Sequence, residues 1–166
     1  MRCGVALGSN VGDRLAHLQT GQAALAKLHT DPAAPLLSPI YETEPVDCEP
    51  GTAPYLNAVM EIEYEGEPLE LFRALQQIER TEGRPATHAR NAPRTLDLDL
   101  LYAGDIALES AELILPHPRI AQRRFVLQPL ADLRPALILP DSHKTVVQLL
   151  AGLPSAPGVT LFSAFP

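Results

Sequence analysis

The chain has 166 residues, of which 46% are hydrophobic and 20% are charged, and its formal net charge is −7. This length suits one domain, so we predict that residues 1–166 form a single folded unit with a sizeable core. The composition argues against disorder, and no apolar stretch reaches the ~18 residues that a membrane span needs. The acidic balance argues against nucleic-acid binding, which relies on surplus Lys and Arg facing phosphates.

Nothing near the start of the chain predicts export. The apolar run from Cys3 to Leu7 is too short for the core of a signal peptide, and no cleavage-site pattern follows it. The two cysteines, Cys3 and Cys48, cannot form a zinc site by themselves, and we expect no disulfide between them. We therefore expect a cytoplasmic protein that does not associate with membranes.

The basic residues are placed unevenly along the chain. Eleven of the thirteen are arginines, and seven of these lie between positions 80 and 124: Arg80, Arg84, Arg90, Arg94, Arg119, Arg123 and Arg124. A local cationic site in an acidic protein indicates a small anionic ligand rather than a polymer.

Apolar spacing predicts the elements of the first half of the chain. Residues 2–7 form an apolar run typical of a strand, and residues 13–29 have the spacing of an amphipathic helix with Asn10 or Asp13 as its cap. Residues 36–41 have strand character and lead into a loop rich in Pro and Gly. Residues 55–65 alternate, which predicts a strand with one buried face formed by its even-numbered residues.

The second half begins with a predicted helix over residues 68–78. Gly83 is expected to terminate this helix as the residue just after its C-cap. Residues 84–94 lack a periodic apolar pattern and predict a loop long enough to suspect a function. Residues 95–102 carry the strongest strand signal, and residues 103–105 predict a hairpin turn into residues 106–108. A short apolar piece at 113–115, helices at 121–130 and 146–150, and a strand at 159–162 follow.

The predicted order is strand, helix, strand, strand, helix, strand, and then shorter elements. Helices packed on one face of a mostly antiparallel sheet in this order form an α+β two-layer sandwich. A doubly wound parallel sheet would need a helix between the second and third strands, and none is predicted there.

Asp97 and Asp99 are the first candidates for chemistry. Two residues apart on a strand, they project from the same face, roughly 6.6 Å from each other, while Leu96, Leu98, Leu100 and Tyr102 take the opposite face. Two carboxylates on one face repel each other, so a cation is expected between or beside them. Such a pair can hold Mg²⁺, which shares its coordination shell with water and substrate phosphates. The alternative is an ordinary solvated sheet face.

The arginines complete a combination suited to phosphoryl transfer. Arg84, Arg90 and Arg94 lie in or beside the predicted loop, and Arg123 follows His117 by six residues. Guanidinium groups bind phosphate oxygens through a planar fork of donors, and charge neutralisation does much of the catalysis in phosphoryl transfer. Taken singly, each of these arginines could equally be a solvated surface residue.

Several other residues admit two readings. His117, between two prolines, could bind a phosphate or make a structural hydrogen bond. Asn57 is the polar exception in its strand, and Tyr55 and Phe125 could present flat faces to a planar ring or simply pack in the core. The segment Gly8–Gly12 lacks the GxxxxGK[ST] pattern, which excludes a Walker-type phosphate loop, and we expect a turn there.

Several motifs, taken together, resemble a known enzyme family. The chain is similar to the 6-hydroxymethyl-7,8-dihydropterin pyrophosphokinases of folate biosynthesis, with matches in order over roughly positions 4 to 140. The specific matches are Pro93-Arg94-Thr95-Leu96-Asp97-Leu98-Asp99, Pro116-His117-Pro118-Arg119 and Arg123-Arg124-Phe125. Supporting matches are Leu7-Gly8-Ser9-Asn10, Tyr41-Glu42-Thr43-Glu44-Pro45 and Tyr55-Leu56-Asn57-Ala58.

The resemblance implies a ferredoxin-like fold and transfer of pyrophosphate from ATP to the hydroxymethyl group of a reduced pterin, with release of AMP. It implies two Mg²⁺ ions held by Asp97 and Asp99 on the ATP phosphates. The residues it implies in catalysis are Arg84, Arg94, Asp97 and Asp99. Those implied in ATP binding are Gln76, Glu79, Arg90, Leu100, His117 and Arg123. Those implied in pterin binding are Thr43, Val46, Tyr55, Asn57 and Phe125, with the ring stacked on Phe125 and bonded to Asn57.

The resemblance also implies that the loop from Arg84 to Arg94 closes over both substrates. Two loop positions depart from the family pattern, since many members carry an arginine where this chain has Ala86 and an aromatic residue where it has Asn91. The implied partners are ATP and 6-hydroxymethyl-7,8-dihydropterin alone, and we expect a monomer.

Two other classes of function stay open on the residues alone. A metal-dependent nucleotidyl transferase or nuclease could use paired aspartates on an open α+β sheet, although it would need a longer basic track than this chain offers. A non-catalytic ligand-sensing domain is the other alternative, and the aspartate pair would then be incidental.

Overall fold

The computed structural model describes residues 1–44, 53–83, 94–140, 142–156 and 158–165. Its main sheet is antiparallel throughout, with the strand order β5-β1-β4-β3-β8 and a short β2 beside β4. These strands are β1 (Arg2–Ser9), β2 (Leu36–Leu37), β3 (Ile40–Thr43), β4 (Tyr55–Glu63), β5 (Asp97–Ala103) and β8 (Val159–Ser163). The central strand β1 pairs with β4 on one side and β5 on the other, so residues at its end are held from both sides.

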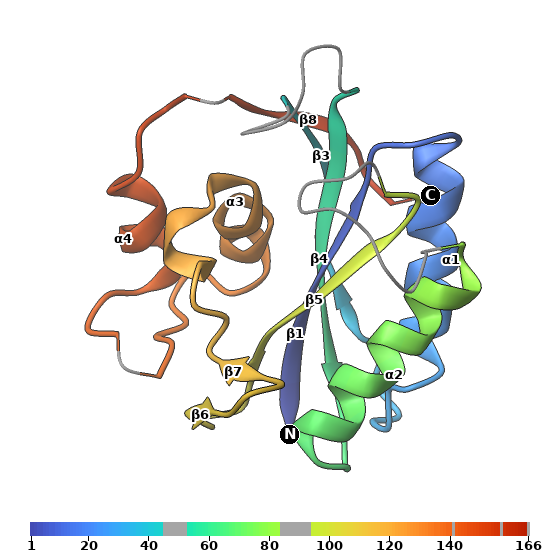
Figure 1. The fold of residues 1–166 in the computed structure, drawn as a ribbon. Coiled ribbons are helices and arrows are strands. Elements are labelled where there is room, and N and C mark those ends of the chain that lie inside the picture. The colour runs from blue at the N-terminus through green and yellow to red at the C-terminus, as the bar shows by residue number, and fades with distance from the viewer. Residues whose placement is uncertain (45–52, 84–93, 141, 157, 166) are drawn as a thin grey trace.

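Two helices complete the strand-helix-strand units. α1 (Arg14–Ala26) follows β1 and α2 (Pro68–Thr81) follows β4, and both cover the same face of the sheet (Figure 1). The βαββαβ chain order combined with the strand order β5-β1-β4-β3 is that of a ferredoxin-like fold. The predicted α+β class and ferredoxin-like fold are therefore confirmed.

Local sequence sets the ends of these helices. Asp13 caps α1, because its Oδ1 accepts a hydrogen bond from Ala16 N at 3.1 Å. Pro68 occupies the first turn of α2, and Gly83 follows its end at a φ of 90°, a conformation that favours glycine. Among the described residues, no helix is both long enough and apolar enough to cross a membrane.

A second pair of helices covers the opposite face of the sheet. α3 (Arg124–Leu133), preceded by a short 3₁₀ helix (Ile120–Gln122), and α4 (Val146–Ala151) lie on the far side from α1 and α2 (Figure 1). Val59 of β4 packs with Val126, Leu127 and Leu130 of α3 in this second core. The prediction of a single buried face for residues 55–65 is therefore wrong: β4 is buried on both faces because α3 covers the side that its polar residues share.

A β-bulge changes which residues of β5 share a face. The register between β1 and β5 shifts between Gly4 and Val5, which pair with Tyr102 and Leu100 and leave Leu101 without a partner across the ladder. Leu96, Leu98 and Leu100 pack in the core under α1 and α2, as predicted, whereas Leu101 and Tyr102 pack in the core under α3. The predicted placement of Tyr102 with the three leucines is wrong, because the extra residue moves it to the other face.

The turn after β5 is placed correctly, but its partner strand is not. Gly104 has a φ of 52° in this turn, as its glycine identity allows. The next strand, β6 (Leu108–Glu109), pairs with β7 (Ile114–Leu115) rather than folding back on β5. The β6-β7 hairpin therefore forms a separate two-stranded sheet, and His117 N beyond it donates to Leu101 O at 2.8 Å.

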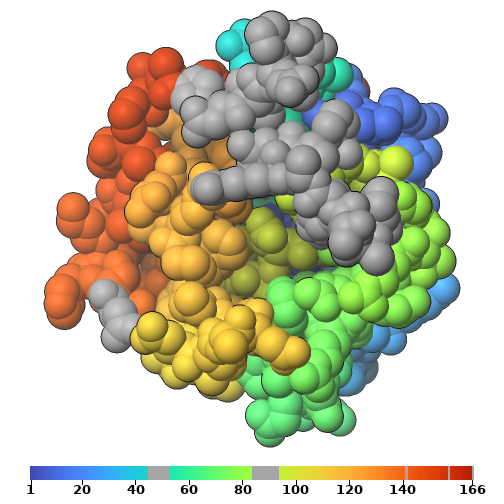
Figure 2. All heavy atoms as spheres, viewed as in Figure 1, coloured from blue at the N-terminus to red at the C-terminus, as the bar shows by residue number. Residues whose placement is uncertain are grey.

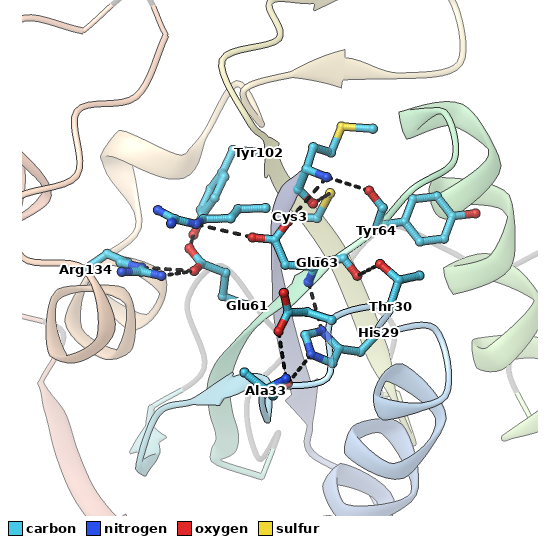
Figure 3. A network of polar contacts seen from close by, with 12 residues as sticks. Cys3, His29, Thr30, Ala33, Glu61, Glu63, Tyr64, Tyr102 and Arg134 are labelled. Carbon is cyan, nitrogen blue, oxygen red and sulfur yellow. Dashed lines mark hydrogen bonds and ion pairs between the residues drawn. The ribbon is translucent and has the colours of Figure 1, made fainter.

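A buried polar network ties the end of α3 to the sheet (Figure 3). The Glu61 carboxylate on β4 is only 5% exposed, and it accepts hydrogen bonds from Tyr102 Oη at 2.6 Å and from Arg134 Nη2 and Nε at 2.5 and 3.0 Å. The hydrogen bond to Glu61 raises the pKa of Arg134, so the guanidinium stays charged. Each partner of this buried carboxylate is a donor, as its burial requires.

Replacing Gly4 by alanine should destabilise the fold. A Cβ at Gly4 would lie 2.2 Å from Cε1 and 2.6 Å from Cζ of the buried Tyr102 ring, which Glu61 holds by its hydroxyl. We expect Gly4→Ala to lower the free energy of unfolding by about 1–3 kcal/mol, as overpacking in a core does. Urea denaturation measures it. Gly152→Ala is the matched control, because its Cβ would meet nothing closer than 3.4 Å, and an equal loss there would show that ring contact is not the cause.

Candidate active site

The two aspartates of β5 lie at one pocket on the α3 side of the sheet. Asp97 and Asp99 have side chains 22% and 35% exposed, whereas Leu98 between them is buried. Both line the pocket with Asn57 of β4 and Phe125 at the start of α3. Figure 2 looks onto the β5 edge of the sheet, where β5 atoms (yellow-green) lie at the bottom of a hollow between α2 (green) and the segment leading into α3 (orange). As predicted, the two carboxylates share a face.

Gly8 keeps the floor of this pocket open. It is the register partner of Asn57 on β4 and of Asp97 on β5, so it lies between them. A Cβ at Gly8 would stand 3.4 Å from Asn57 Oδ1 and 3.9 Å from Asp97 Cβ. A larger side chain there would occupy the space between the amide and the carboxylate.

Each aspartate is paired with an arginine from a different segment. Arg94 Nη1 lies 2.5 Å from Asp97 Oδ1, and Arg123 Nη1 lies 3.0 Å from Asp99 Oδ2. Burial opposes the charged form of Arg94, but the neighbouring Asp97 outweighs it and the pKa of Arg94 is raised. The structure therefore brings two carboxylates and two guanidinium groups together. Arg94 lies 3 residues before Asp97 in the sequence, and Arg123 lies 24 residues after Asp99.

His117 adds a neutral donor beside Asp99. Its Nε2 is 4.0 Å from Asp99 Oδ2, and its Nδ1 accepts a hydrogen bond from Arg119 N at 3.1 Å. Burial lowers the pKa of His117, with Arg123 and Arg119 adding to this and Asp99 opposing it, so the imidazole is neutral at pH 7. Because Nδ1 is an acceptor, the neutral tautomer carries its proton on Nε2, the nitrogen that faces Asp99.

Two of the residues assigned to the pterin, Asn57 and Phe125, line the same pocket as the two carboxylates. Asn57 Nδ2 donates to Thr43 Oγ1 at 2.8 Å, and both side chains are buried. Tyr55 lies two residues before Asn57 on β4 and pairs with Thr43 in register. Phe125 lines the pocket, and Cζ of the Arg123 guanidinium lies over its ring, 5.6 Å from the ring centroid. An amide and an aromatic ring thus face the carboxylates, which suits a flat heterocycle beside a phosphate.

A second groove continues from Asp99 towards α2. Leu100 and His117 line it together with Phe72 of α2 and the β6-β7 hairpin. Glu79 is nearly enclosed, at 3% exposed, and its Oε1 accepts from Leu98 N at 2.8 Å, between the two aspartates. Gln76 lies three residues before it on α2 and is half-buried. Leu100 therefore lies on the groove wall, whereas Glu79 is turned towards the backbone of β5.

Three predicted site residues lie outside the described residues. These are Val46, Arg84 and Arg90, and the two departures from the family pattern, Ala86 and Asn91, lie there as well. Their roles stay predictions.

Sequence reasoning did not name Asn10 as a site residue, although it gave Asn10 as a possible helix cap and as part of a supporting motif. Asn10 is 4% exposed and makes two hydrogen bonds with the backbone of Arg94. The available signal was the polar pair Ser9-Asn10 directly after a buried apolar strand, where both side chains are enclosed rather than solvated.

The donor set of the pocket fits a hard divalent cation. Asp97 and Asp99 present carboxylate oxygens, the ligands that Mg²⁺ prefers, and both are partly open to solvent. Within the described ranges, no cluster of three or more His, Cys, Asp or Glu residues is arranged to hold a metal. A cation here would therefore depend on two protein carboxylates and complete its shell with water and substrate oxygens, as Mg²⁺ commonly does beside phosphates.

A family model described as 7,8-dihydro-6-hydroxymethylpterin-pyrophosphokinase (HPPK) matches residues 4–135. The chain belongs to this family. The 2-amino-4-hydroxy-6-hydroxymethyldihydropteridine pyrophosphokinase of Bacillus subtilis is 44% identical over 131 residues, which cover 78% of this chain and 75% of the relative. The HPPK relative of Pseudomonas aeruginosa, which has the same name, is 39% identical over 151 residues and covers 90% of each chain.

This HPPK chain spans only part of some relatives. The folic acid synthesis protein fol1 of Schizosaccharomyces pombe is 39% identical over 163 residues, which are 97% of this chain but 21% of fol1. A crystal structure of Plasmodium falciparum HPPK-DHPS with SDX-DHP matches with a TM-score of 0.66 and 13% identity, covering 90% of this chain and 44% of that one. This likeness supports the fold alone.

Proposed function

We infer that this chain transfers pyrophosphate from ATP to the hydroxymethyl group of 6-hydroxymethyl-7,8-dihydropterin and releases AMP. One observation carries the inference: Asp97 and Asp99, each paired with an arginine, share a pocket with Asn57 and Phe125. The carboxylates and cations suit a nucleotide triphosphate, and the amide and ring suit a pterin. Membership of the HPPK family supports the same reaction.

The proposed reaction is an in-line displacement at the β-phosphorus of ATP. The substrate hydroxyl oxygen forms a new bond to that phosphorus and loses its proton to solvent, while the bond from phosphorus to the α,β-bridging oxygen breaks and AMP leaves. Asp97 and Asp99 would hold Mg²⁺, two ions in our proposal. Such ions, when bound, neutralise charge on the phosphates.

The cationic side chains would act on the phosphates directly. Arg94 and Arg123 now face Asp97 and Asp99, and each has further N–H groups that can bind phosphate oxygens. Because Arg94 keeps its charge, it can stabilise negative charge that grows in the transition state. His117 would donate from Nε2 to a phosphate oxygen rather than act as a base, because its Nδ1 already accepts from Arg119 N.

Asn57 would select the pterin through one atom of its amide. Nδ2 is engaged with Thr43 Oγ1, so Oδ1 remains to accept a ring N–H of the pterin. Phe125 would pack against the ring, and Tyr55 would help to close this side of the pocket. Val46, Arg84 and Arg90 keep their predicted roles in this proposal, as do Gln76 and Glu79 beside the nucleotide.

Replacing Asn57 by alanine should weaken pterin binding more than catalysis. A lost hydrogen bond to a polar ring edge costs about 1–3 kcal/mol, so we expect the KM for the pterin to rise about 10- to 100-fold. The KM for ATP should change little, because Asn57 does not line the second groove, which His117 and Leu100 line. Steady-state kinetics with each substrate varied in turn measures both constants. Equal increases in the two KM values would contradict the assignment.

The nucleotide product tests the function itself. Protein, ATP, Mg²⁺ and the pterin should yield AMP and a pyrophosphorylated pterin. ADP would indicate an ordinary kinase, inorganic pyrophosphate would favour a nucleotidyl transferase, and absence of turnover would favour a ligand-sensing domain.

We also propose that residues 1–166 form one domain that acts as a monomer in the cytoplasm. Both substrates are small molecules, and the residues assigned to them all come from one chain. Analytical ultracentrifugation at micromolar concentration tests the monomer, and a dimer would require the pocket to be examined for residues from a second copy.

A further inference from the structure

Asn10 holds both backbone polar groups of Arg94. Its side-chain Oδ1 accepts from Arg94 N at 2.8 Å, and its own N donates to Arg94 O at 3.1 Å. Asn10 is 4% exposed, so these bonds are shielded from water. The two hydrogen bonds fix the main chain of Arg94 to the end of β1.

The end of β1 is a rigid reference for this contact. Gly8, two residues earlier, pairs with Asn57 on β4 and with Asp97 on β5, so β1 is held from both sides up to its last residues. Arg94 lies three residues before Asp97, and its Nη1 reaches Asp97 Oδ1 at 2.5 Å. The Arg94 side chain is therefore held at both ends: Asn10 fixes its main chain, and Asp97 on β5 binds its guanidinium.

Stability alone does not explain the polar atoms left around this contact. Asn10 Nδ2, Arg94 Nε and Ser9 Oγ are buried without a hydrogen-bond partner among the described residues. Each buried unpaired polar group costs about 1–3 kcal/mol. Asn10 Oδ1 is the acceptor for Arg94 N, so we explain the asparagine by what it does to the Arg94 main chain.

We propose that Asn10 is a positioning residue for pyrophosphoryl transfer, acting by holding the Arg94 main chain so that its guanidinium is aimed at Asp97 and the phosphates. The proposal rests on the proposed function, because it works through the catalytic role of Arg94. It differs from a helix-cap role, which Asp13 already fills.

A double-mutant cycle tests whether Asn10 acts through Arg94. Asn10→Ala should lower kcat about 10- to 100-fold, as misplacement of a catalytic group does, with smaller changes in both KM values. In an Arg94→Ala background, Asn10→Ala should lower kcat no further, because no guanidinium is left to aim. Independent, multiplying losses would overturn the proposal, and so would an unchanged kcat in Asn10→Ala.

Two further variants separate positioning from stability. Asn10→Asp retains an oxygen that can accept from Arg94 N, so it should keep kcat within about 3-fold of wild type. A loss of about 10-fold or more in a folded Asn10→Asp would overturn the proposal, even if Asn10→Ala fails to fold. Ser38→Ala is the control, since Ser38 Oγ is a buried acceptor for Val59 N at 2.9 Å away from the pocket. It should lower the melting temperature and leave kcat unchanged.

Hydrogen exchange gives a readout that does not need turnover. The Arg94 amide should exchange faster in Asn10→Ala than in wild type, because its acceptor is lost, and an unchanged rate would contradict the contact. If the wild-type protein makes no AMP, the proposed function fails, whereas this exchange result still reports on the contact itself.

Discussion

Asp97→Asn should abolish pyrophosphoryl transfer and leave the fold nearly intact. The substitution keeps the shape of the side chain but removes the negative charge that would hold a divalent cation beside the phosphates. We expect kcat to fall by about 10³-fold or more, the loss typical of removing electrostatic stabilisation of a transition state. The fold should lose only about 1–2 kcal/mol, because the hydrogen bond to Arg94 weakens while repulsion from Asp99 is relieved.

A matched carboxylate outside the pocket separates chemistry from stability. Asp132 on α3 accepts a hydrogen bond from Tyr41 Oη at 2.5 Å, so Asp132→Asn also weakens a bonded carboxylate. It should lower the melting temperature at least as much as Asp97→Asn and leave the rate of AMP formation unchanged. If Asp97→Asn kept more than a tenth of the activity, or unfolded when Asp132→Asn did not, the aspartate pair would be structural.

The ferredoxin-like core was predictable because its elements carry strong local patterns. The apolar run of β1, the alternation of β4 and the Leu-Asp repeat of β5 each specify a strand without reference to the rest of the chain. The same repeat also gave the shared face of Asp97 and Asp99. A period of two along a strand decides which side chains meet a ligand, and no tertiary contact is needed to read it.

What the sequence could not give depends on contacts between distant segments. Val59 and Glu61 look like the outer face of a two-layer protein until α3 covers them. In the sequence, Tyr102 continues the alternation of β5. The bulge that turns it to the other face depends on the register with β1. Asn10 is likewise an ordinary turn residue until Arg94, 84 residues later, lies against it.

The site is formed where three strands of the sheet meet two later segments. Asn57, Gly8 and Asp97 lie side by side across β4, β1 and β5, and the glycine leaves the gap that a substrate would fill. Arg123 and Phe125, from the start of α3, close this gap from above the sheet. The second helical layer, which the sequence reading underestimated, is therefore what turns a sheet surface into a pocket.

Arg94→Ala should lower kcat more than it weakens binding of either substrate. The side chain is held at 2.5 Å from Asp97, which raises its pKa against the opposing effect of burial, so the guanidinium stays charged. If its charge serves the transition state, kcat should fall about 10²- to 10³-fold, with KM for the pterin changed by less than about 5-fold. Single-turnover kinetics with saturating ATP isolates the chemical step from product release.

Two arginine variants define what this result would mean. Arg94→Lys keeps the charge but loses the planar fork, so it should recover only part of the rate, because one ammonium cannot bond Asp97 and a phosphate oxygen in the same geometry. Arg2→Ala removes an exposed arginine whose ion pair with Glu63 lies at the other end of β1, and it should leave kcat unchanged. Equal losses of kcat and pterin affinity in Arg94→Ala would show that this guanidinium contributes to ground-state binding. Asp97 would then stabilise the transition state without help from Arg94.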